Sequence, residues 1–298
     1  MNQRLFTQTM KVNALVCFLA AVLWIGVGMP SRAGETAAEV VALWKDGKMP
    51  GHVAAGSEKE LPARGDNVVR ITDISEPTIT VFRARGVGKA TPAVIICPGG
   101  GYNLLAYNKE GSEVVAWLNS IGITGIVLKY RVPGNQDGAF QDLQRAVRMV
   151  RHNASAWNIA ADRVGVMGFS AGGHLCARLS TNADQASYLS LDGVDEEKLR
   201  PDFALLIYPA YLSRVAGKLA ADLPVSGRTP PTFIVHTEDD RSLVAGSKVY
   251  HAALEAAQVA NEFFLCATGG HGYGLRSDKE VGVWPEKCRQ WLMRVGVL

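Results

Sequence analysis

A serine stands between two glycines at residues 168–172, which read G-F-S-A-G, directly after the apolar run 163–167. An apolar run followed by glycines indicates a buried strand that turns sharply into a helix. At such a turn the hydroxyl of Ser170 would stand exposed at a sheet edge, where it can act as a nucleophile. The pattern alone is weak, because glycine-rich turns also serve close packing or phosphate binding. The interpretation therefore depends on partner residues elsewhere in the chain.

A serine hydroxyl needs a general base and an acid that orients this base, and candidates for both follow later strand patterns. The β-rich run 231–236 leads into T-E-D-D at 237–240, and the apolar run 262–266 leads into a glycine-rich segment around His271. Catalytic groups in open α/β sheets lie beyond the carboxyl ends of the strands, so these positions suit the chemistry. We predict His271 as the base and one of the carboxylates at 238–240 as the acid.

A glycine loop supplies candidates for stabilising the negative charge that develops during attack on a carbonyl. Residues 98–102 read P-G-G-G-Y and follow the apolar run 93–97. Three glycines let backbone amides approach an oxygen without obstruction by side chains. We predict the amides of Gly100, Gly101 and Ala171 as an oxyanion hole. Standing alone, the same loop would read as a flexible glycine turn.

The rest of the chain alternates between strand and helix patterns. Strands are expected at 68–74, 78–83, 93–97, 123–129, 163–168, 203–208, 231–236 and 262–267, and helices at 112–121, 139–157, 171–182, 244–258 and 284–295. The first two strands are expected to pair through a short turn. This alternation predicts an α/β fold, a mostly parallel eight-stranded sheet with helices on both faces.

Two connections between these elements are polar or rich in turn residues. The segments 184–202 and 210–230 are too short for a large lid domain. We expect them to rim an open pocket, which suits a bulky or polymeric substrate. Tyr102 and Tyr273, beside the glycine loop and the base, are candidates for the pocket wall.

Six short segments carry a family resemblance. They are P-G-G-G-Y at 98–102, E-G at 110–111, K-Y-R at 129–131, G-F-S-A-G-G-H at 168–174, H-T-E-D-D at 236–240 and G-G-H-G-Y-G at 269–274. Together they resemble the acetyl-xylan and feruloyl esterase-like branch of the α/β-hydrolases, over residues 40–298. The resemblance implies the α/β-hydrolase fold. Counted along the expected strands, the four site segments agree with its plan: the glycine loop follows the third strand, Ser170 the fifth, the acid the seventh and His271 the eighth. It implies a carboxylic ester as substrate more firmly than it implies xylan.

The resemblance also implies which carboxylate is the acid. By its distance from His236, Asp240 matches the acid of the family. Many relatives have a proline after this loop, where the chain has L-V at 243–244. Asp239 is therefore kept as the reserve candidate and Glu238 as a further one, since neighbouring carboxylates also serve as turn formers or helix caps. A serine–histidine–aspartate triad of this kind needs no cofactor.

The first 33 residues have the layout of a secretory signal peptide. Arg4 and Lys11 precede the apolar stretch 12–29, and small residues precede a cut after Ala33. We expect 1–33 to be removed and 34–298 to form one catalytic domain, secreted or periplasmic. The apolar stretch is also long enough for an uncleaved anchor.

The charge balance excludes one class of partner. Cleavage after residue 33 removes three basic residues and leaves 28 Lys and Arg against 28 Asp and Glu. A chain with this charge balance has no overall excess of positive charge with which to bind nucleic acid. No stable membrane association is expected after cleavage, and the sequence leaves the oligomeric state open.

The cysteines favour packing over metal binding. Four of them, Cys97, Cys176, Cys266 and Cys288, fall in apolar strands or helices and are expected to act as small buried residues. In an exported protein, a disulfide between two of them is an open alternative. The sequence has no C-x-x-C or H-x-x-x-H spacing, so no metal site is expected.

These patterns and the resemblance lead to a functional expectation. We expect a secreted serine esterase that removes acetyl or feruloyl groups from xylan-type polysaccharide, with a small-molecule ester or the acylated polymer as its partner. The alternatives are a general short-chain carboxylesterase or a serine peptidase of the same fold. A remote alternative is a catalytically silent hydrolase fold used for binding.

Overall fold

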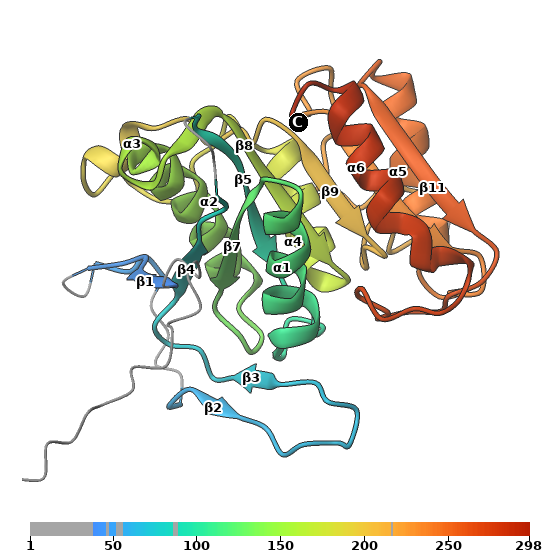
Figure 1. Cartoon of the computed structure of the whole chain (residues 1–298), viewed down its shortest axis with the longest axis horizontal. Coiled ribbons are helices and arrows are strands. Elements are labelled where there is room, and N and C mark those ends of the chain that lie inside the picture. The colour runs from blue at the N-terminus through green and yellow to red at the C-terminus, as the bar shows by residue number, and fades with distance from the viewer. Residues whose placement is uncertain (1–37, 46–47, 52–55, 86–88, 216) are drawn as a thin grey trace, which may run out of the picture. The chain divides into compact units, whose positions relative to one another are not determined.

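The computed structural model describes residues 38–45, 48–51, 56–85, 89–215 and 217–298. The expected signal peptide at 1–33 lies outside the described residues. An eight-stranded sheet forms the centre of the described chain (Figure 1). In sheet order its strands are β1 (Glu39–Ala42), β4 (Thr78–Phe82), β7 (Thr124–Lys129), β5 (Thr91–Cys97), β8 (Ile159–Phe169), β9 (Ala204–Ile207), β10 (Thr232–Thr237) and β11 (Asn261–Cys266).

The sheet is mostly parallel, as the sequence predicts. Strand β4 runs antiparallel to both β1 and β7, and every other neighbouring pair is parallel. Parallel strands require crossover connections, and helices supply these except between β9 and β10, where the described residues contain no helix. The carboxyl ends of β5, β8, β10 and β11 therefore lie along the same edge of the sheet, where the predicted site residues follow them.

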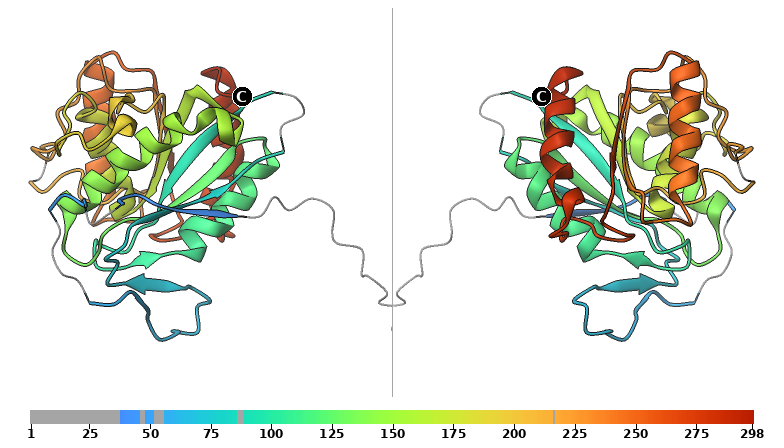
Figure 2. Two further views of the ribbon diagram at one scale, coloured as in Figure 1. Left: turned by 90° about the vertical axis from the view of Figure 1, so that its left-hand side faces the viewer. Right: turned by 90° about the vertical axis from the view of Figure 1, so that its right-hand side faces the viewer.

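Helices cover both faces of the sheet (Figure 2). Helices α2 (Gln136–His152), α4 (Ala171–Thr181) and α5 (Val244–Ala256) pack on one face, and α1 (Glu113–Ser120) and α6 (Trp284–Arg294) pack on the other. The four-residue helix α3 (Ala154–Trp157) follows α2. Because successive strand residues point to opposite faces, Ile95 joins the first core and Ile96 the second, both fully buried.

The expected pairing of the first two strands is wrong. Strand β3 (Arg70–Thr72) joins β2 (Lys59–Glu60) and β6 (Leu105–Ala106) in a separate antiparallel sheet. Strand β4 pairs instead with β1, which the sequence analysis did not predict. Alternation of polar and apolar residues marks a strand but does not identify its partner. The count is unchanged, so the site segments still follow the third, fifth, seventh and eighth strands of the large sheet.

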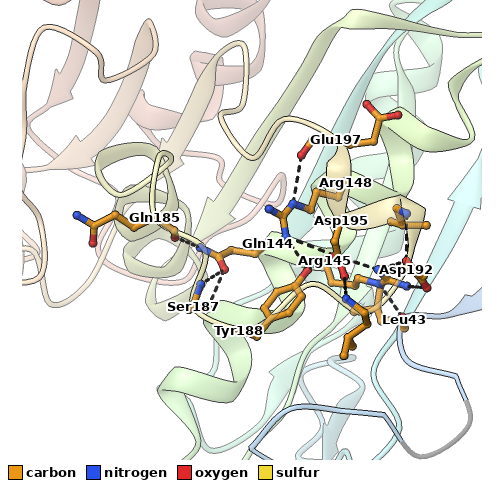
Figure 3. Close-up of polar contacts among 12 residues, drawn as sticks. Leu43, Gln144, Arg145, Arg148, Gln185, Ser187, Tyr188, Asp192, Asp195 and Glu197 are labelled. Atoms are coloured by element: carbon orange, nitrogen blue, oxygen red, sulfur yellow. Dashed lines mark hydrogen bonds and ion pairs between the residues drawn. The ribbon is translucent and has the colours of Figure 1, made fainter.

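A polar network centred on the buried side chains of Arg145 and Asp195 fixes the connection between α4 and β9 onto α2 (Figure 3). Two guanidinium nitrogens of Arg145 lie 2.8 and 2.7 Å from the carboxylate oxygens of Asp192, and one lies 2.9 Å from Oδ1 of Asp195. The hydroxyl of Tyr188 also donates to Asp195, at 2.7 Å. The connection contains the short 3₁₀ helix η2 (Gly193–Glu196). In the described chain, neither this connection nor the one between β9 and β10 forms a lid domain.

The four cysteines of the described chain are free and buried, which confirms their expected role as small core residues. They lie within or at the ends of strands and helices, where a thiol packs like a small apolar side chain. Across the same described ranges, none of the helices has the length and apolar character needed to cross a membrane.

Candidate active site

Ser170 occupies a sharp turn between β8 and α4. Its backbone has φ 52° and ψ −117°, a conformation that residues other than glycine rarely adopt. A Cβ atom on Gly168 would lie 2.1 Å from the carbonyl oxygen of Gly172, and one on Gly172 would lie 2.0 Å from that of Cys97. Both flanking positions therefore require glycine. This steric demand is the reason that the G-x-S-x-G pattern marks the turn.

Ser170, His271 and Asp240 form one chain of hydrogen bonds. The Oγ atom of Ser170 lies 2.8 Å from Nε2 of His271, and Nδ1 of His271 lies 2.6 Å from Oδ2 of Asp240. An ionised carboxylate only accepts, so Nδ1 of His271 carries the proton. Nε2 is then free to accept the proton of the serine hydroxyl. This is the tautomer that a general base requires.

The three carboxylates at 238–240, in the acid loop that follows β10, have different partners. Of the three, Asp240 contacts His271, and its side chain is 4% exposed. Asp239 accepts hydrogen bonds from two backbone amides of the loop that carries His271, at 3.1 and 2.8 Å. The amide of Gly270 is the main cause that lowers the pKa of Asp239 to about 2. Glu238 pairs with a lysine of α5 at 2.7 Å.

Asp240 is held by a second imidazole, that of His236. Nε2 of His236 lies 2.9 Å from Oδ2 of Asp240, and Nδ1 lies 2.7 Å from the hydroxyl of Ser247. Burial lowers the pKa of His236, which keeps this ring neutral with the proton on Nε2. Although burial opposes it, hydrogen bonds from His236 and His271 hold the pKa of Asp240 below its ordinary value. Asp240 is therefore an ionised, doubly anchored acceptor.

His236, Asp240 and His271 also bring three potential metal ligands within 4.8 Å of one another. The carboxylate lies 2.9 and 2.6 Å from the two imidazole nitrogens, which are hydrogen-bond lengths. A zinc ion would bind each ligand at about 2.0–2.2 Å and would have to displace the proton from each ring. The chemistry of this cluster fits hydrogen bonding around the carboxylate better than metal coordination.

The glycine loop after β5 lies beside Ser170. A Cβ atom on Gly99 would lie 2.8 Å from Cβ of Ser170. Gly100 and Gly101 have φ values of 142° and 66°, and a Cβ on Gly100 would lie 2.1 Å from a backbone oxygen of the same loop. Among the hydrogen bonds of the described ranges, none uses the amides of Gly100, Gly101 or Ala171 as donors. These amides are available to a bound oxygen, and their role as an oxyanion hole stays a prediction.

The two tyrosines predicted for the pocket wall are buried. Tyr102 is 2% exposed, and its hydroxyl lies 2.9 Å from Nδ1 of His174. Tyr273 is 6% exposed and packs edge-on against Tyr208, with ring centroids 4.4 Å apart. Both rings therefore act mainly in packing. Contact of either with substrate stays a prediction.

An exposed aromatic ring that the sequence analysis missed stands near the site. Tyr211 is 36% exposed and has φ 58°. It follows Ala210, whose amide donates to the carbonyl oxygen of Ser170 at 2.9 Å. It also lines a cavity of about 170 Å³, together with Ser242 of the acid loop and neighbouring residues. The sequence carried no signal for it, because the connection 210–230 shows neither regular periodicity nor a motif.

Comparison with known proteins identifies the family. The BD-FAE family model matches residues 80–202. The crystal structure of an acetyl ester-xyloside bifunctional hydrolase from Caldicellulosiruptor lactoaceticus is 32% identical, with a TM-score of 0.71 over 87% of this chain and 97% of that chain. The chain belongs to the acetylxylan esterase-like α/β-hydrolases. The predicted α/β-hydrolase fold and the family resemblance are thus both confirmed.

Two curated proteins are similar to part of this chain. The acetylxylan esterase of Xylanibacter ruminicola is 31% identical over 230 residues, which are 68% of this chain and 44% of the relative. The endo-1,4-beta-xylanase B of Butyrivibrio fibrisolvens is 28% identical over 222 residues, which are 64% of this chain and 34% of the relative. The chain therefore spans less than half the length of these relatives. A carboxylesterase from Lactobacillus plantarum, 24% identical with a TM-score of 0.65 over 81% of this chain and 98% of that chain, shares the fold.

Proposed function

We propose that the chain is a serine esterase whose substrates are acetyl esters on xylan-type carbohydrate. The observation that carries the proposal is the continuous hydrogen-bond chain from Ser170 through His271 to Asp240, beside amides without acceptors. The family membership supports ester hydrolysis by this chain. The names of the relatives, an acetylxylan esterase and an acetyl ester-xyloside hydrolase, support the acetylated sugar.

The first half of the reaction forms an acyl-enzyme. Nε2 of His271 takes the hydroxyl proton of Ser170 while Oγ attacks the ester carbonyl. The carbonyl oxygen becomes an oxyanion that accepts hydrogen bonds from Ala171 and the glycine loop, which lowers the barrier because these donors are already in place. Asp240 stabilises the imidazolium. The C–O bond to the alcohol then breaks, and the imidazolium returns its proton to the leaving oxygen.

The second half repeats these steps with water. His271 removes a proton from a water molecule, whose oxygen attacks the acyl carbonyl. The same amides hold the second oxyanion. When this intermediate collapses, Oγ of Ser170 leaves and recovers its proton from the imidazolium, which releases the carboxylic acid. The groups of the chain itself supply each proton transfer and each stabilising charge.

A panel of esters tests the substrate class. We expect kcat/KM for an acetylated xylo-oligosaccharide to exceed that for a simple aliphatic acetate by at least about tenfold, which corresponds to about 1.4 kcal/mol. Feruloyl esters in the same panel distinguish the acyl group. A preference below tenfold would remove the carbohydrate assignment and favour the general carboxylesterase. Cleavage of peptides in place of esters would favour the peptidase.

Tyr211 provides a sharper test of the sugar. Aromatic rings bury large apolar areas, and the apolar face of a sugar ring can pack on such a surface. We expect Tyr211→Ala to lower kcat/KM for the acetylated xylo-oligosaccharide by about tenfold, since a lost packing contact costs about 1–2 kcal/mol. With p-nitrophenyl acetate, which has no sugar, the change should stay within about threefold. Equal losses on both substrates would show that Tyr211 supports the site but does not select the sugar.

A further inference from the structure

Glu110 is a buried carboxylate that the proposed mechanism does not use. It lies in the π-helical turn η1 (Asn108–Ser112) and is 5% exposed. Its Oε2 accepts from the amide of Gly99 at 2.7 Å, and its Oε1 accepts from the hydroxyl of Tyr208 at 2.8 Å. Burial raises the pKa of Glu110, and these two hydrogen bonds oppose that change. Turns of this type are frequent at functional sites.

Tyr208 connects this carboxylate to the loop that carries the base. It follows β9 directly and is fully buried. Its hydroxyl accepts from the amide of Gly274 at 3.0 Å, and its ring lies edge-on to the imidazole of His271, with centroids 5.0 Å apart. The carbonyl of Gly274 accepts in turn from the indole of Trp284 at 2.9 Å. The phenol therefore anchors the loop that carries His271 through the amide of Gly274.

The directions of these hydrogen bonds are set by chemistry. The amides of Gly99 and Gly274 can only donate, and the ionised carboxylate of Glu110 can only accept. The hydroxyl of Tyr208 therefore accepts from Gly274 and donates to Glu110. The ionised form of Glu110 accepts both donors that reach it. Glu110 and Tyr208 therefore form a bridge between the two loops in which every donor is hydrogen-bonded, as buried polar groups require.

The bridge joins two loops that must act on the same reacting carbon. One end is Gly99, directly before the predicted oxyanion donors and in contact with Ser170. The other end is Gly274, three residues after His271. The loops follow β5 and β11, which do not neighbour each other in the sheet. Sheet pairing between these two strands therefore cannot fix their relative positions.

We propose that Glu110 and Tyr208 are positioning residues that hold the oxyanion donors and the base in register for one tetrahedral intermediate. The inference rests on the proposed function. Both side chains are buried and act through the loops, without touching substrate. A misplacement of about 1 Å between such groups can cost about 100-fold in rate, so the bridge should affect kcat more than KM.

Tyr208→Phe tests the bridge because it removes the hydroxyl and keeps the ring. With p-nitrophenyl acetate, we expect kcat to fall at least about tenfold while KM stays within about twofold. The rate at which a fluorophosphonate labels Ser170 should fall in parallel, since its phosphoryl oxygen needs the same donors. The labelling endpoint counts folded active sites, so kcat is reported per site.

Tyr250→Phe is the matched control. Tyr250 is also fully buried, in α5, and its hydroxyl has no hydrogen-bond partner in the described structure. Its kcat should therefore stay within about twofold of that of the unmodified protein. A loss of the same size in both variants, or a kcat of Tyr208→Phe within twofold of the unmodified protein, would overturn the inference.

A double-mutant cycle separates a shared bridge from two independent supports. Glu110→Gln keeps the shape of the side chain but presents an amide to Tyr208, so it should also lower kcat at least about tenfold. If both residues act through one bridge, the double variant should lose no more than the more damaged single variant, whereas additive losses would contradict the proposal. Glu110→Gln alone carries the test if Tyr208→Phe does not fold. If Ser170→Ala is inactive and both bridge variants keep their kcat, the inference fails and the esterase proposal stands.

Discussion

Ser170→Ala should abolish ester hydrolysis and leave the fold intact. We expect kcat with p-nitrophenyl acetate to fall by roughly 10⁶-fold, as losses of a serine nucleophile do elsewhere. The reason is geometric, because the Ser170 hydroxyl lies 2.8 Å from the base and ends the hydrogen-bond chain. Initial rates measure the loss of activity. Circular dichroism and thermal unfolding should show an unchanged fold, because alanine leaves the backbone of the turn equally strained.

Ser180→Ala is the control for this variant. Ser180 lies on α4, the helix that follows Ser170, and its buried hydroxyl donates to the carbonyl of Cys176 at 2.8 Å. Its removal should leave turnover within about twofold, because the helix keeps its own backbone bonds. If Ser170→Ala retained more than about one hundredth of the activity, the serine mechanism would be refuted.

Asp240→Asn is expected to lower kcat by about 10³- to 10⁴-fold. An asparagine amide can turn its NH₂ group toward Nδ1 of His271, which then moves its proton to Nε2 and can no longer accept from Ser170. The loss should appear in kcat at all pH values where the wild-type enzyme is active, because the tautomer and not a charge equilibrium has changed. Steady-state kinetics between pH 6 and 9 measure it.

Asp239→Asn provides the comparison, because the two aspartates are adjacent and only one contacts His271. Asp239 accepts from two amides of the base loop, and an asparagine keeps one accepting oxygen. We expect a loss of about tenfold or less. A larger loss from Asp239→Asn than from Asp240→Asn would transfer the role of the acid to Asp239.

Much of the architecture could be predicted because most of the strands from β5 onward are buried along most of their length, with β11 the mainly half-buried exception. Their apolar runs and the intervening amphipathic helices are local patterns, and parallel order follows from the alternation. The pairing of β4 with β1 could not be predicted. Strand β1 is four residues long and half exposed, so it offers little apolar signal, and partner choice depends on contacts between distant segments.

The candidate site could likewise be predicted only in part. The positions of Ser170, the glycine loop and His271 are marked by glycines that the backbone itself requires, and a single sequence displays these. The choice of Asp240 over Asp239 depends on how the acid loop turns, which spacing alone left open. Glu110 and Tyr208 are 98 residues apart in the chain, and no local sequence pattern predicts the hydrogen bond between them. The leader at 1–33 stays a prediction.

The strained backbone of Ser170 lowers the folding stability of the chain at the position where the proposed mechanism needs the nucleophile. A non-glycine residue held at φ 52° costs about 1–3 kcal/mol of folding free energy. A substitution that relaxed this residue would raise the free energy of unfolding, but under the proposed mechanism it would also withdraw the hydroxyl from the substrate. Thermostable descendants of this chain would therefore have to gain their resistance elsewhere, for example in the surface charges and loops remote from the serine.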